Sequence, residues 1–269
     1  MIHALRAAFR LATWLGWTLA LLPAHLVALA VSPRAAALLP VFYHRGACRI
    51  LGITVDAQGA RARARPVLYV CNHTSYLDIV VLGALIPGSF IAKTEVAGWP
   101  VFGLLAKLQR SVFVARRRPG AARERDAVAV RLDAGDNLIL FPEGTSNDGN
   151  RVLPFKSALF AVAARRPRGR PLVVQPVSLA YSHLDGLPLG RHQRPLVAWY
   201  GDMEMGGHLW RLVGLGRLRA RVIFHEPVTI EAFASRKALA AHCHAAIAAG
   251  VAEALRNAGP LAPVTERLA

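Results

Sequence analysis

The chain has 269 residues, enough for one sizeable domain with its own core. Hydrophobic residues make up 54% of it, yet they are not gathered into many long spans, which excludes a polytopic transporter. A net charge of +17 favours an anionic partner such as nucleic acid, a membrane surface or a phosphorylated substrate, although an arginine- and alanine-rich composition is also what a GC-rich genome encodes. The three widely spaced cysteines predict a reducing compartment, with no disulfide framework or zinc site.

An apolar segment near the N-terminus predicts membrane association. Leu11 to Val31 contains no charged residue and is long enough to cross a bilayer as a helix. A signal peptide, a spanning helix and a bent hairpin lying in one leaflet all fit this pattern, but no clear signal cleavage site follows. Pro23 predicts a break or kink in mid-segment, and arginines on both flanks leave the positive-inside rule without a preferred orientation.

We therefore expect the hairpin, with both of its ends on the cytoplasmic side. Trp14 and Trp17 are expected to be interfacial anchors or simply lipid-facing bulk. The domain prediction is a membrane-associated helical anchor over residues 1–50 and an α/β domain over residues 51–269.

Short apolar runs alternate with helical patterns along the rest of the chain. A helix is expected to end at Gly52, and a polar loop or short edge strand to follow over 57–65. Strands are predicted at 66–71, 89–92, 111–115, 137–141, 172–180 and 219–224. Helices are predicted at 75–86, 101–108, 121–134, 156–165 and from a Ser235 cap to before Gly259, with a frayed tail beyond. This alternation predicts an α/β fold whose mostly parallel central sheet is flanked by helices.

A polar block, Asn72 to Asp78, directly follows the first buried strand. The carboxyl ends of strands are where open α/β sheets bind ligands. On one continuous helix His73 and Asp78 would lie about 140° apart, but a strand-to-helix turn between them would bring the two side chains together. A carboxylate that holds one imidazole nitrogen leaves the other as a base for a hydroxyl group. A helix cap with an ordinary hydrogen-bonded histidine explains this block alone about as well.

Two further strand ends carry polar groups. Glu143, Gly144 and Thr145 follow the strand at 137–141, and Arg116 lies just past the strand at 111–115. Arginine suits bidentate binding of phosphate or carboxylate. Because parallel strands end at the same edge, these residues are expected to meet the histidine there.

In these blocks the sequence resembles the lysophosphatidate acyltransferase superfamily of glycerolipid acyltransferases. Asn72, His73 and Asp78 match its first motif, in which four residues separate histidine from aspartate. Phe113 with Arg116 matches the second motif, Phe141 to Thr145 the third in full, and Pro176 the fourth. The resemblance runs from about residue 45 to residue 228, with the motifs in the family's order.

The resemblance implies a role for each matched residue. It implies His73 as the general base on the acceptor hydroxyl and Asp78 as the group that orients it. It implies substrate binding by the second and third motifs and by Asn72. Lys93, at the end of the strand 89–92, is a candidate for oxyanion stabilisation, although a plain surface lysine fits equally well.

The resemblance also implies the partners. The acyl donor would be acyl-CoA or acyl carrier protein as co-substrate, with no metal or other cofactor, and the acceptor a lysolipid at an anionic membrane. An N-terminal two-helix element would dock the enzyme on the cytoplasmic face of the inner cell membrane.

The sequence departs from the family at one position that bears on the acceptor's head group. Many members carry arginine after the third motif, where this chain has Ser146. Arg117, Arg118, Arg151 or Lys156 would have to replace that phosphate ligand if the acceptor is 1-acylglycerol-3-phosphate, which is the acceptor we expect. The stretch from Thr145 to Lys156 is similar to bacterial lyso-ornithine lipid acyltransferases, whose acceptor lacks phosphate, and this is the alternative.

Two other classes of protein fit parts of the sequence. A nucleic-acid-binding protein would explain the positive charge, and a non-catalytic membrane-surface protein would explain both charge and anchor. Neither gives His73 and Asp78 a task, so we expect no nucleic-acid partner and an enzyme that acts by direct, single-displacement transfer.

Overall fold

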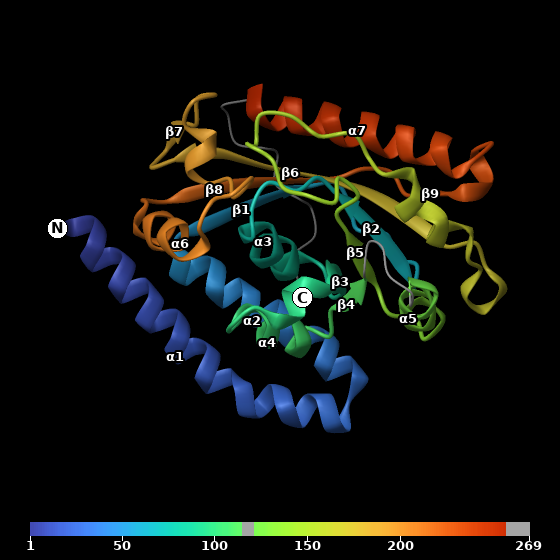
Figure 1. The fold of residues 1–269 in the computed structure, drawn as a ribbon, viewed down its shortest axis with the longest axis horizontal. Coiled ribbons are helices and arrows are strands. Elements are labelled where there is room, and N and C mark those ends of the chain that lie inside the picture. The colour runs from blue at the N-terminus through green and yellow to red at the C-terminus, as the bar shows by residue number, and fades with distance from the viewer. Residues whose placement is uncertain (115–120, 257–269) are drawn as a thin grey trace.

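The computed structural model describes residues 1–114 and 121–256, apart from the side chains of 121–126. Among these residues one sheet contains seven strands in the order β1-β8-β6-β2-β5-β3-β4, and two short strands add to β6 (Figure 1). The strands are β1 (Ile53–Gln58), β2 (Val67–Cys71), β3 (Ser89–Lys93), β4 (Val112–Val114), β5 (Leu138–Leu140), β6 (Val173–Leu184), β7 (Leu187–Pro188), β8 (Leu218–Phe224) and β9 (Val228–Thr229).

The predicted α/β fold with a mostly parallel sheet is confirmed. Neighbours along the path pair in parallel, except for the antiparallel pair of β6 and β8. The register of β2 places Val70 beside Leu140 of β5 and Pro176 of β6. The carboxyl ends of β2, β5, β3 and β4 therefore lie at one edge of the sheet.

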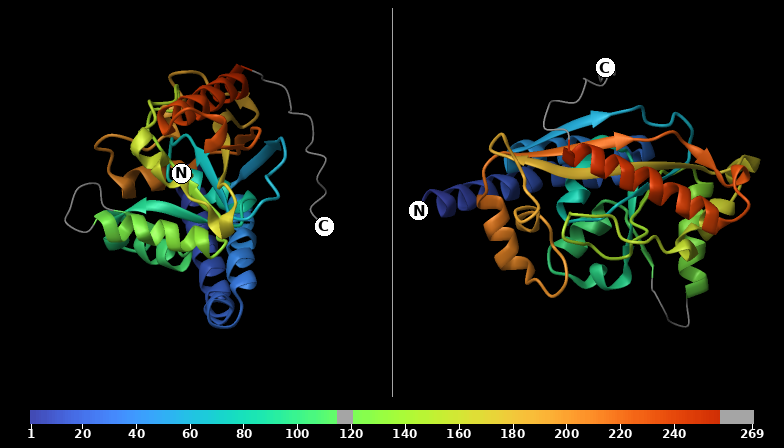
Figure 2. Two further views of the ribbon diagram at one scale, coloured as in Figure 1. Left: turned by 90° about the vertical axis from the view of Figure 1, so that its right-hand side faces the viewer. Right: turned by 90° about the horizontal axis from the view of Figure 1, so that it is seen from above.

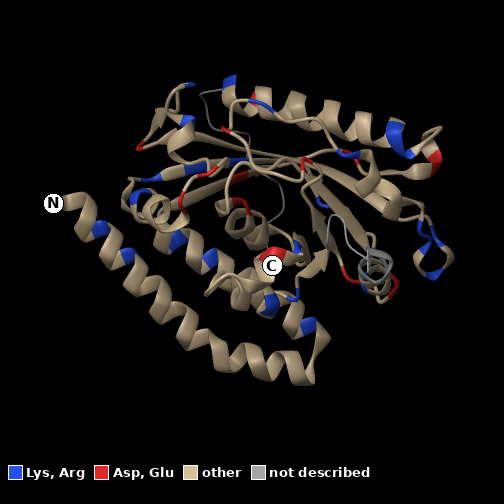
Figure 3. Cartoon of the chain, in the orientation of Figure 1, with Lys and Arg blue, Asp and Glu red and all other residues tan. Residues whose placement is uncertain are grey.

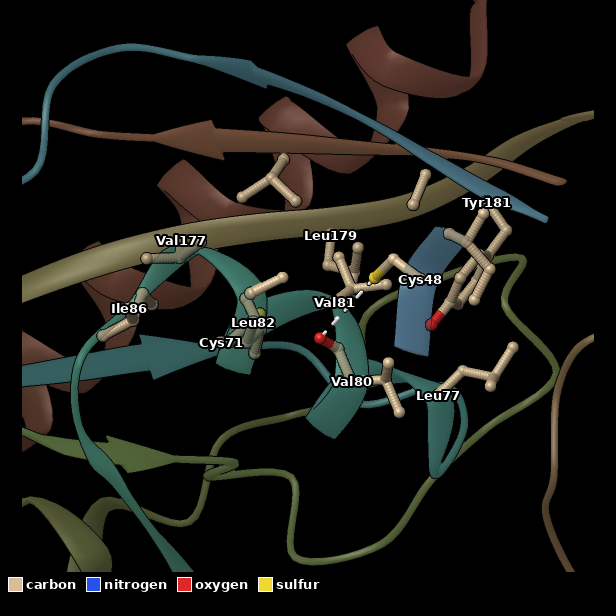
Figure 4. Close-up of a cluster of buried hydrophobic side chains, with 14 of the residues drawn as sticks. Cys48, Cys71, Leu77, Val80, Val81, Leu82, Ile86, Val177, Leu179 and Tyr181 are labelled. Atoms are coloured by element: carbon tan, nitrogen blue, oxygen red, sulfur yellow. Dashed lines mark hydrogen bonds between the residues drawn. The ribbon is translucent and has the colours of Figure 1, made fainter. Parts of the chain in front are cut away.

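Helices cover both faces of the sheet (Figure 2). On one face α2 (Pro33–Leu51) and α3 (Leu77–Leu85) pack on it, and Figure 4 shows Cys48 of α2 and Val81 of α3 against Leu179 of β6. On the other face α7 (Arg236–Arg256), α5 (Ala121–Asp133) and the 3₁₀ helix η2 (Ser157–Ala164) form a second core. Burial of these two apolar layers is the main stabilising contribution to the fold.

The N-terminal segment forms a helical hairpin, but Pro23 does not break it. Helix α1 (Ile2–Val31) continues through Pro23, and the chain reverses at Ser32 and Pro33. The Ser32 hydroxyl caps α2 by accepting a bond from the Ala35 amide at 3.2 Å. Proline lacks a backbone N–H group, and the first position of a helix needs none, so Pro33 fits the start of α2. The turn therefore forms where the Ser32 cap and Pro33 are adjacent.

The tryptophans of α1, expected as interfacial anchors or lipid-facing bulk, direct their indole N–H groups to α2 instead. The Trp14 indole donates to the Tyr43 hydroxyl at 2.9 Å, and the Trp17 indole donates to the Tyr43 carbonyl at 3.1 Å. Both rings therefore join α1 to α2, while the outer side of α1 exposes leucines and Phe9.

Arginine also fastens α1 to the α/β domain. Arg10 donates to the carbonyls of Val213 and Leu215, at 3.0 and 2.8 Å, at the end of α6 (Met205–Gly214). A cation at the C-terminus of a helix is favoured by the helix dipole. Figure 3 shows the two basic residues near the start of α1, and the rest of that helix carries no charge.

Helices α1 and α7 are the two described helices long and apolar enough to cross a membrane. The apolar stretch of α7 is 39% buried and supplies core residues such as Leu239 and Ile247, whereas that of α1 is only 11% buried. Of the two, α1 has the exposed apolar surface that suits lipid.

Other elements differ from the sequence expectation in detail. The segment predicted as a helix at 156–165 is the 3₁₀ helix η2, in which Phe160 and Ala163 face the core at the three-residue spacing of that helix. The stretch 57–65, expected as a polar loop or a short edge strand, is loop after Gln58, and the edge strand β1 begins earlier, at Ile53. The remaining short helices are η1 (Thr94–Gly98), α4 (Phe102–Leu108), η3 (Pro167–Gly169), η4 (Arg194–Leu196) and η5 (Ile230–Ala232).

Helix α6 was not predicted, because its first turn contains Gly206 and Gly207, which are poor helix formers. The side chain of Glu204 compensates by accepting bonds from both glycine amides, at 2.9 and 2.6 Å. The tail expected to fray lies outside the described residues.

Gly83 marks the closest contact between α3 and α2. A Cβ atom at this position would lie 2.3 Å from the His44 ring, so alanine has no room. We expect Gly83→Ala to lower the free energy of unfolding by about 1–3 kcal/mol. Gly16 of α1 has no atom within 4 Å of the corresponding position, so Gly16→Ala is the matched control and should be neutral or stabilising. Thermal unfolding of the detergent-solubilised protein measures both, and equal stability of the two variants would contradict this packing.

Candidate active site

The predicted site residues follow three adjacent strands. His73 comes after β2, Glu143 after β5 and Lys93 ends β3. These strands are parallel neighbours, so all three residues lie at the carboxyl edge of the sheet. Arg116, which would follow β4, lies outside the described residues, as do Arg117 and Arg118.

The structure brings His73 and Asp78 together. The His73 Nδ1 atom lies 2.8 Å from the Asp78 Oδ2 atom. Helix α3 begins only at Leu77, so the intervening residues form a turn that folds the imidazole back over the first helical turn. The His73 ring stacks on Phe141 with its centroid 4.2 Å away and the planes 16° apart. The imidazole is thus held from one edge and one face.

Asp78 is fully buried and accepts from four donors. Its Oδ2 atom also accepts from the amides of Thr74 and Ser75, at 2.7 and 3.0 Å. Its Oδ1 atom accepts from the Tyr181 hydroxyl at 2.8 Å. A carboxylate with these partners at a helix start acts as an acceptor only, so the His73 Nδ1 atom carries the proton and Nε2 keeps its lone pair.

The Glu143 side chain binds the turn formed by residues 73–76, called the catalytic turn below, and does not point into open space. Its exposure is 2%; Oε1 accepts from the His73 amide at 2.8 Å, and Oε2 accepts from Asn147 Nδ2 and the Leu153 amide at 2.7 and 2.9 Å. Burial raises the pKa of Glu143 to about 7, against these donors, which lower it. We expected substrate contact here, but the structure gives both carboxylate oxygens to the protein.

Asn72 is placed in the same way. Its exposure is 2%, and its amide pairs with the backbone of Leu179, donating to the carbonyl at 2.8 Å and accepting from the amide at 2.9 Å. These two bonds continue the pairing of β2 with β6 beyond the strand end. The structure therefore gives Asn72 a positioning task in place of the substrate contact that we expected.

The other predicted residues are more exposed than Asn72 and Glu143. Gly144 adopts a positive φ of 67°, which lets the chain turn directly after Glu143, and Thr145 is exposed. Lys93 is exposed at the same edge, two strands from β2. Ser146, at the position where many family members have arginine, donates its hydroxyl to the Trp199 carbonyl.

Two further residues, not predicted from the sequence, bind His73 or Asp78. Tyr181 lies on β6, the strand that carries Pro176 of the fourth motif, and the alternation of that strand puts it on the same face as Val177 and Leu179, toward α3. Asn147 follows the third motif and binds the His73 carbonyl through its amide and side chain, at 3.2 and 3.1 Å. Alternation could have identified the tyrosine as inward-facing, but no local pattern shows the asparagine's partner.

An apolar cavity of about 170 Å³ lies beside the catalytic turn. Its wall includes Tyr76, the last residue of that turn, and Leu77, the first residue of α3. The hairpin forms a second part of the wall with Leu21, Leu22, Leu39 and Tyr43. The segment from η1 to α4 forms a third part with Val96, Trp99, Phe102 and Leu105. The cavity therefore extends from the end of the catalytic turn to the helix that exposes apolar side chains.

Comparison with known proteins gives the same assignment as the motifs. A model of the acyltransferase family matches residues 52–180. A lyso-ornithine lipid O-acyltransferase of Brucella abortus is 45% identical over 244 residues, covering 89% of this chain and 91% of that protein. This chain belongs to the acyltransferase family.

Two other members of the acyltransferase family show how far the similarity extends. A 1-acyl-sn-glycerol-3-phosphate acyltransferase of Neisseria meningitidis is 36% identical over 183 residues, covering 67% of this chain and 68% of that protein. The crystal structure of the 1-acyl-sn-glycerophosphate acyltransferase PlsC from Thermotoga maritima has the same fold, with a TM-score of 0.69 at 21% identity over 96% of this chain and 99% of that one.

Replacing the buried carboxylate tests the geometry of the pair. Asp78→Asn keeps the shape but offers an amide group in place of one acceptor oxygen, which disfavours the Nδ1-protonated imidazole. We expect kcat to fall by about 10⁴-fold, as for the corresponding change in a serine protease triad. Tyr181→Phe removes one donor and should cost about tenfold. Steady-state acyl transfer measures both, and an Asp78→Asn variant within tenfold of wild type would rule out this arrangement.

The raised pKa of Glu143 predicts a pH-dependent stability. The carboxyl group of Glu143 binds its proton more tightly in the folded protein than in the unfolded chain. Its contribution to the free energy of unfolding is therefore complete below about pH 4.5 and is lost as the pH rises through about 7. Relative to Glu143→Gln, wild type should lose about 3 kcal/mol of unfolding free energy between pH 4.5 and 8. Denaturant unfolding of both proteins at these two pH values measures this loss. A stability difference between them that does not change with pH would contradict it.

Proposed function

We propose that the chain transfers a fatty acyl group from a thioester, on acyl-CoA or acyl carrier protein, to the free hydroxyl of lyso-ornithine lipid. The observation that carries the transfer is the His73–Asp78 pair, held on a turn whose end, Tyr76, lines an apolar cavity. Two observations favour this acceptor over 1-acylglycerol-3-phosphate, which the sequence alone had led us to expect. Ser146 removes a phosphate ligand, and the 45% identical relative acts, by its name, on lyso-ornithine lipid.

The proposed reaction is a single displacement with His73 as the proton carrier. The Nε2 atom takes the proton of the acceptor hydroxyl, and the oxygen attacks the thioester carbonyl. The new C–O bond forms, the C–S bond breaks, and the thiolate leaves with the proton from His73. Lys93, at the same edge, is proposed to stabilise the oxyanion, and Thr145, Gly144 and Arg116 to contact the acceptor.

The acyl chains are proposed to lie in the apolar cavity and to enter it from the membrane. The hairpin supplies one wall of that cavity, and its outer side exposes Leu15, Leu19 and Leu26. We propose that residues 1–50 anchor the protein monotopically on the cytoplasmic face of the membrane, with the α/β domain over 51–269 above it. Basic residues near the anchor would favour anionic lipid and an acidic carrier.

Acyl transfer by the purified chain in vesicles tests this function. Lyso-ornithine lipid and lysophosphatidate are offered separately with acyl-CoA or acyl carrier protein. We expect faster acylation of lyso-ornithine lipid, and a loss of at least 10³-fold in His73→Ala. Faster acylation of lysophosphatidate would contradict the acceptor, and full activity of His73→Ala would contradict the mechanism.

A further inference from the structure

We propose that Trp99, Trp199 and Tyr76 form a binding site for the ammonium group of the acceptor's head group. This inference rests on the proposed lyso-ornithine lipid acceptor and adds a subsite to it. The Trp99 and Trp199 rings meet at 85° with centroids 5.8 Å apart, and the Tyr76 ring lies 6.0 Å from Trp199 at 55°. These three rings, called the aromatic corner below, come from the residue after η1, the loop after η4 and the catalytic turn.

The aromatic corner adjoins the catalytic turn directly. The Trp199 amide donates to the Thr74 carbonyl at 3.0 Å, one residue from His73. Tyr76 and Trp99 both line the apolar cavity. A lipid whose chain occupies that cavity and whose hydroxyl reaches His73 therefore has its polar end in the region of the corner.

The chemistry of the corner suits a cation rather than a phosphate. Faces of indole and phenol rings carry negative partial charge and attract ammonium groups within about 6 Å. All three rings are only partly exposed, which strengthens such attraction by excluding water. Ornithine has a side-chain amine like that of lysine, and it is protonated at neutral pH. A phosphate would meet the same ring faces unfavourably.

Hydrogen bonds hold the rings of the corner in place. The Trp199 indole donates to the Met203 carbonyl at 3.0 Å, and the Tyr76 hydroxyl lies 2.8 Å from His208 Nδ1. Burial, and then the charge of Arg211, lower the pKa of His208, which favours the neutral form of the imidazole behind the Tyr76 ring. The polar edges are therefore used by the protein.

Two carboxylates lie close to the corner. The loop that follows Trp199 carries the exposed side chains of Asp202 and Glu204, with Arg211 as the cation near Glu204. Ser146 binds the Trp199 carbonyl, so an arginine at this position would bring a guanidinium close to this ring. The serine therefore leaves the corner without that competing cation.

A pair of acceptors isolates the ammonium group. Lyso-ornithine lipid is compared with the same lipid acetylated on its side-chain amine, using full-length protein in vesicles. The readout is the ratio of KM for the acetylated acceptor to KM for the free amine, so that losses common to both acceptors cancel. For wild type this ratio should lie well above one.

Trp99 is the residue to vary, with leucine removing the ring and phenylalanine keeping a weaker one. We expect Trp99→Leu to lower the ratio by about 3- to 30-fold, toward one, and Trp99→Phe to give an intermediate value. If Trp99→Leu does not fold, the KM ratio of Trp99→Phe alone tests the site, and it should be lower than that of wild type.

The possible failures are distinguishable. A ratio that is unchanged in both variants, with lyso-ornithine lipid still acylated, would overturn the ammonium site while leaving the proposed function intact. If wild type acylates lysophosphatidate but not lyso-ornithine lipid, both the acceptor and the subsite are wrong.

Discussion

The buried carboxylate of Asp78 is the group on which the rest of the site depends. An isolated charge at 0% exposure would be very costly, and four donors offset that cost. Three of them come from the catalytic turn, and the fourth, Tyr181, comes from the centre of the sheet. The same bonds that make the charge tolerable therefore fix the turn, the start of α3 and the orientation of His73. Removing the carboxylate would disturb the fold locally as well as the chemistry.

A second carboxylate, Glu143, complements the first at the other side of the turn. Asp78 binds the imidazole of His73, and Glu143 binds its backbone amide. The Asn147 side chain donates hydrogen bonds both to the His73 carbonyl and to the Glu143 carboxylate. The first and third motifs are thus joined by bonds that leave the Nε2 side of the ring for substrate. In this chain each of the two motifs therefore positions the other.

The sequence predicted the fold and the proximity of His73 and Asp78 well, because both follow from local patterns. Short apolar runs identify strands, and a strand-to-helix turn between His73 and Asp78 is the only way to join residues that a helix would separate. The partners of Glu143 and Asn72 were not predictable, since their bonds go to backbone groups up to 107 residues away. Pro23 misled the prediction of the anchor, because packing of α1 on α2 and α6 outweighs the local preference of proline. The aromatic corner could not be predicted either, because its three rings come from segments that are separate in the sequence.

The central claim is that Asp78 holds His73 in the tautomer that can accept a proton. Nitrogen-15 NMR of the His73 side chain, in protein labelled at histidine and assigned with His73→Ala, measures this directly at a pH where the ring is neutral. The account predicts a protonated Nδ1 and a bare Nε2 atom in wild type, with this preference weakened or reversed in Asp78→Asn. A wild-type ring protonated on Nε2, or one indifferent to the Asp78 substitution, would contradict the account.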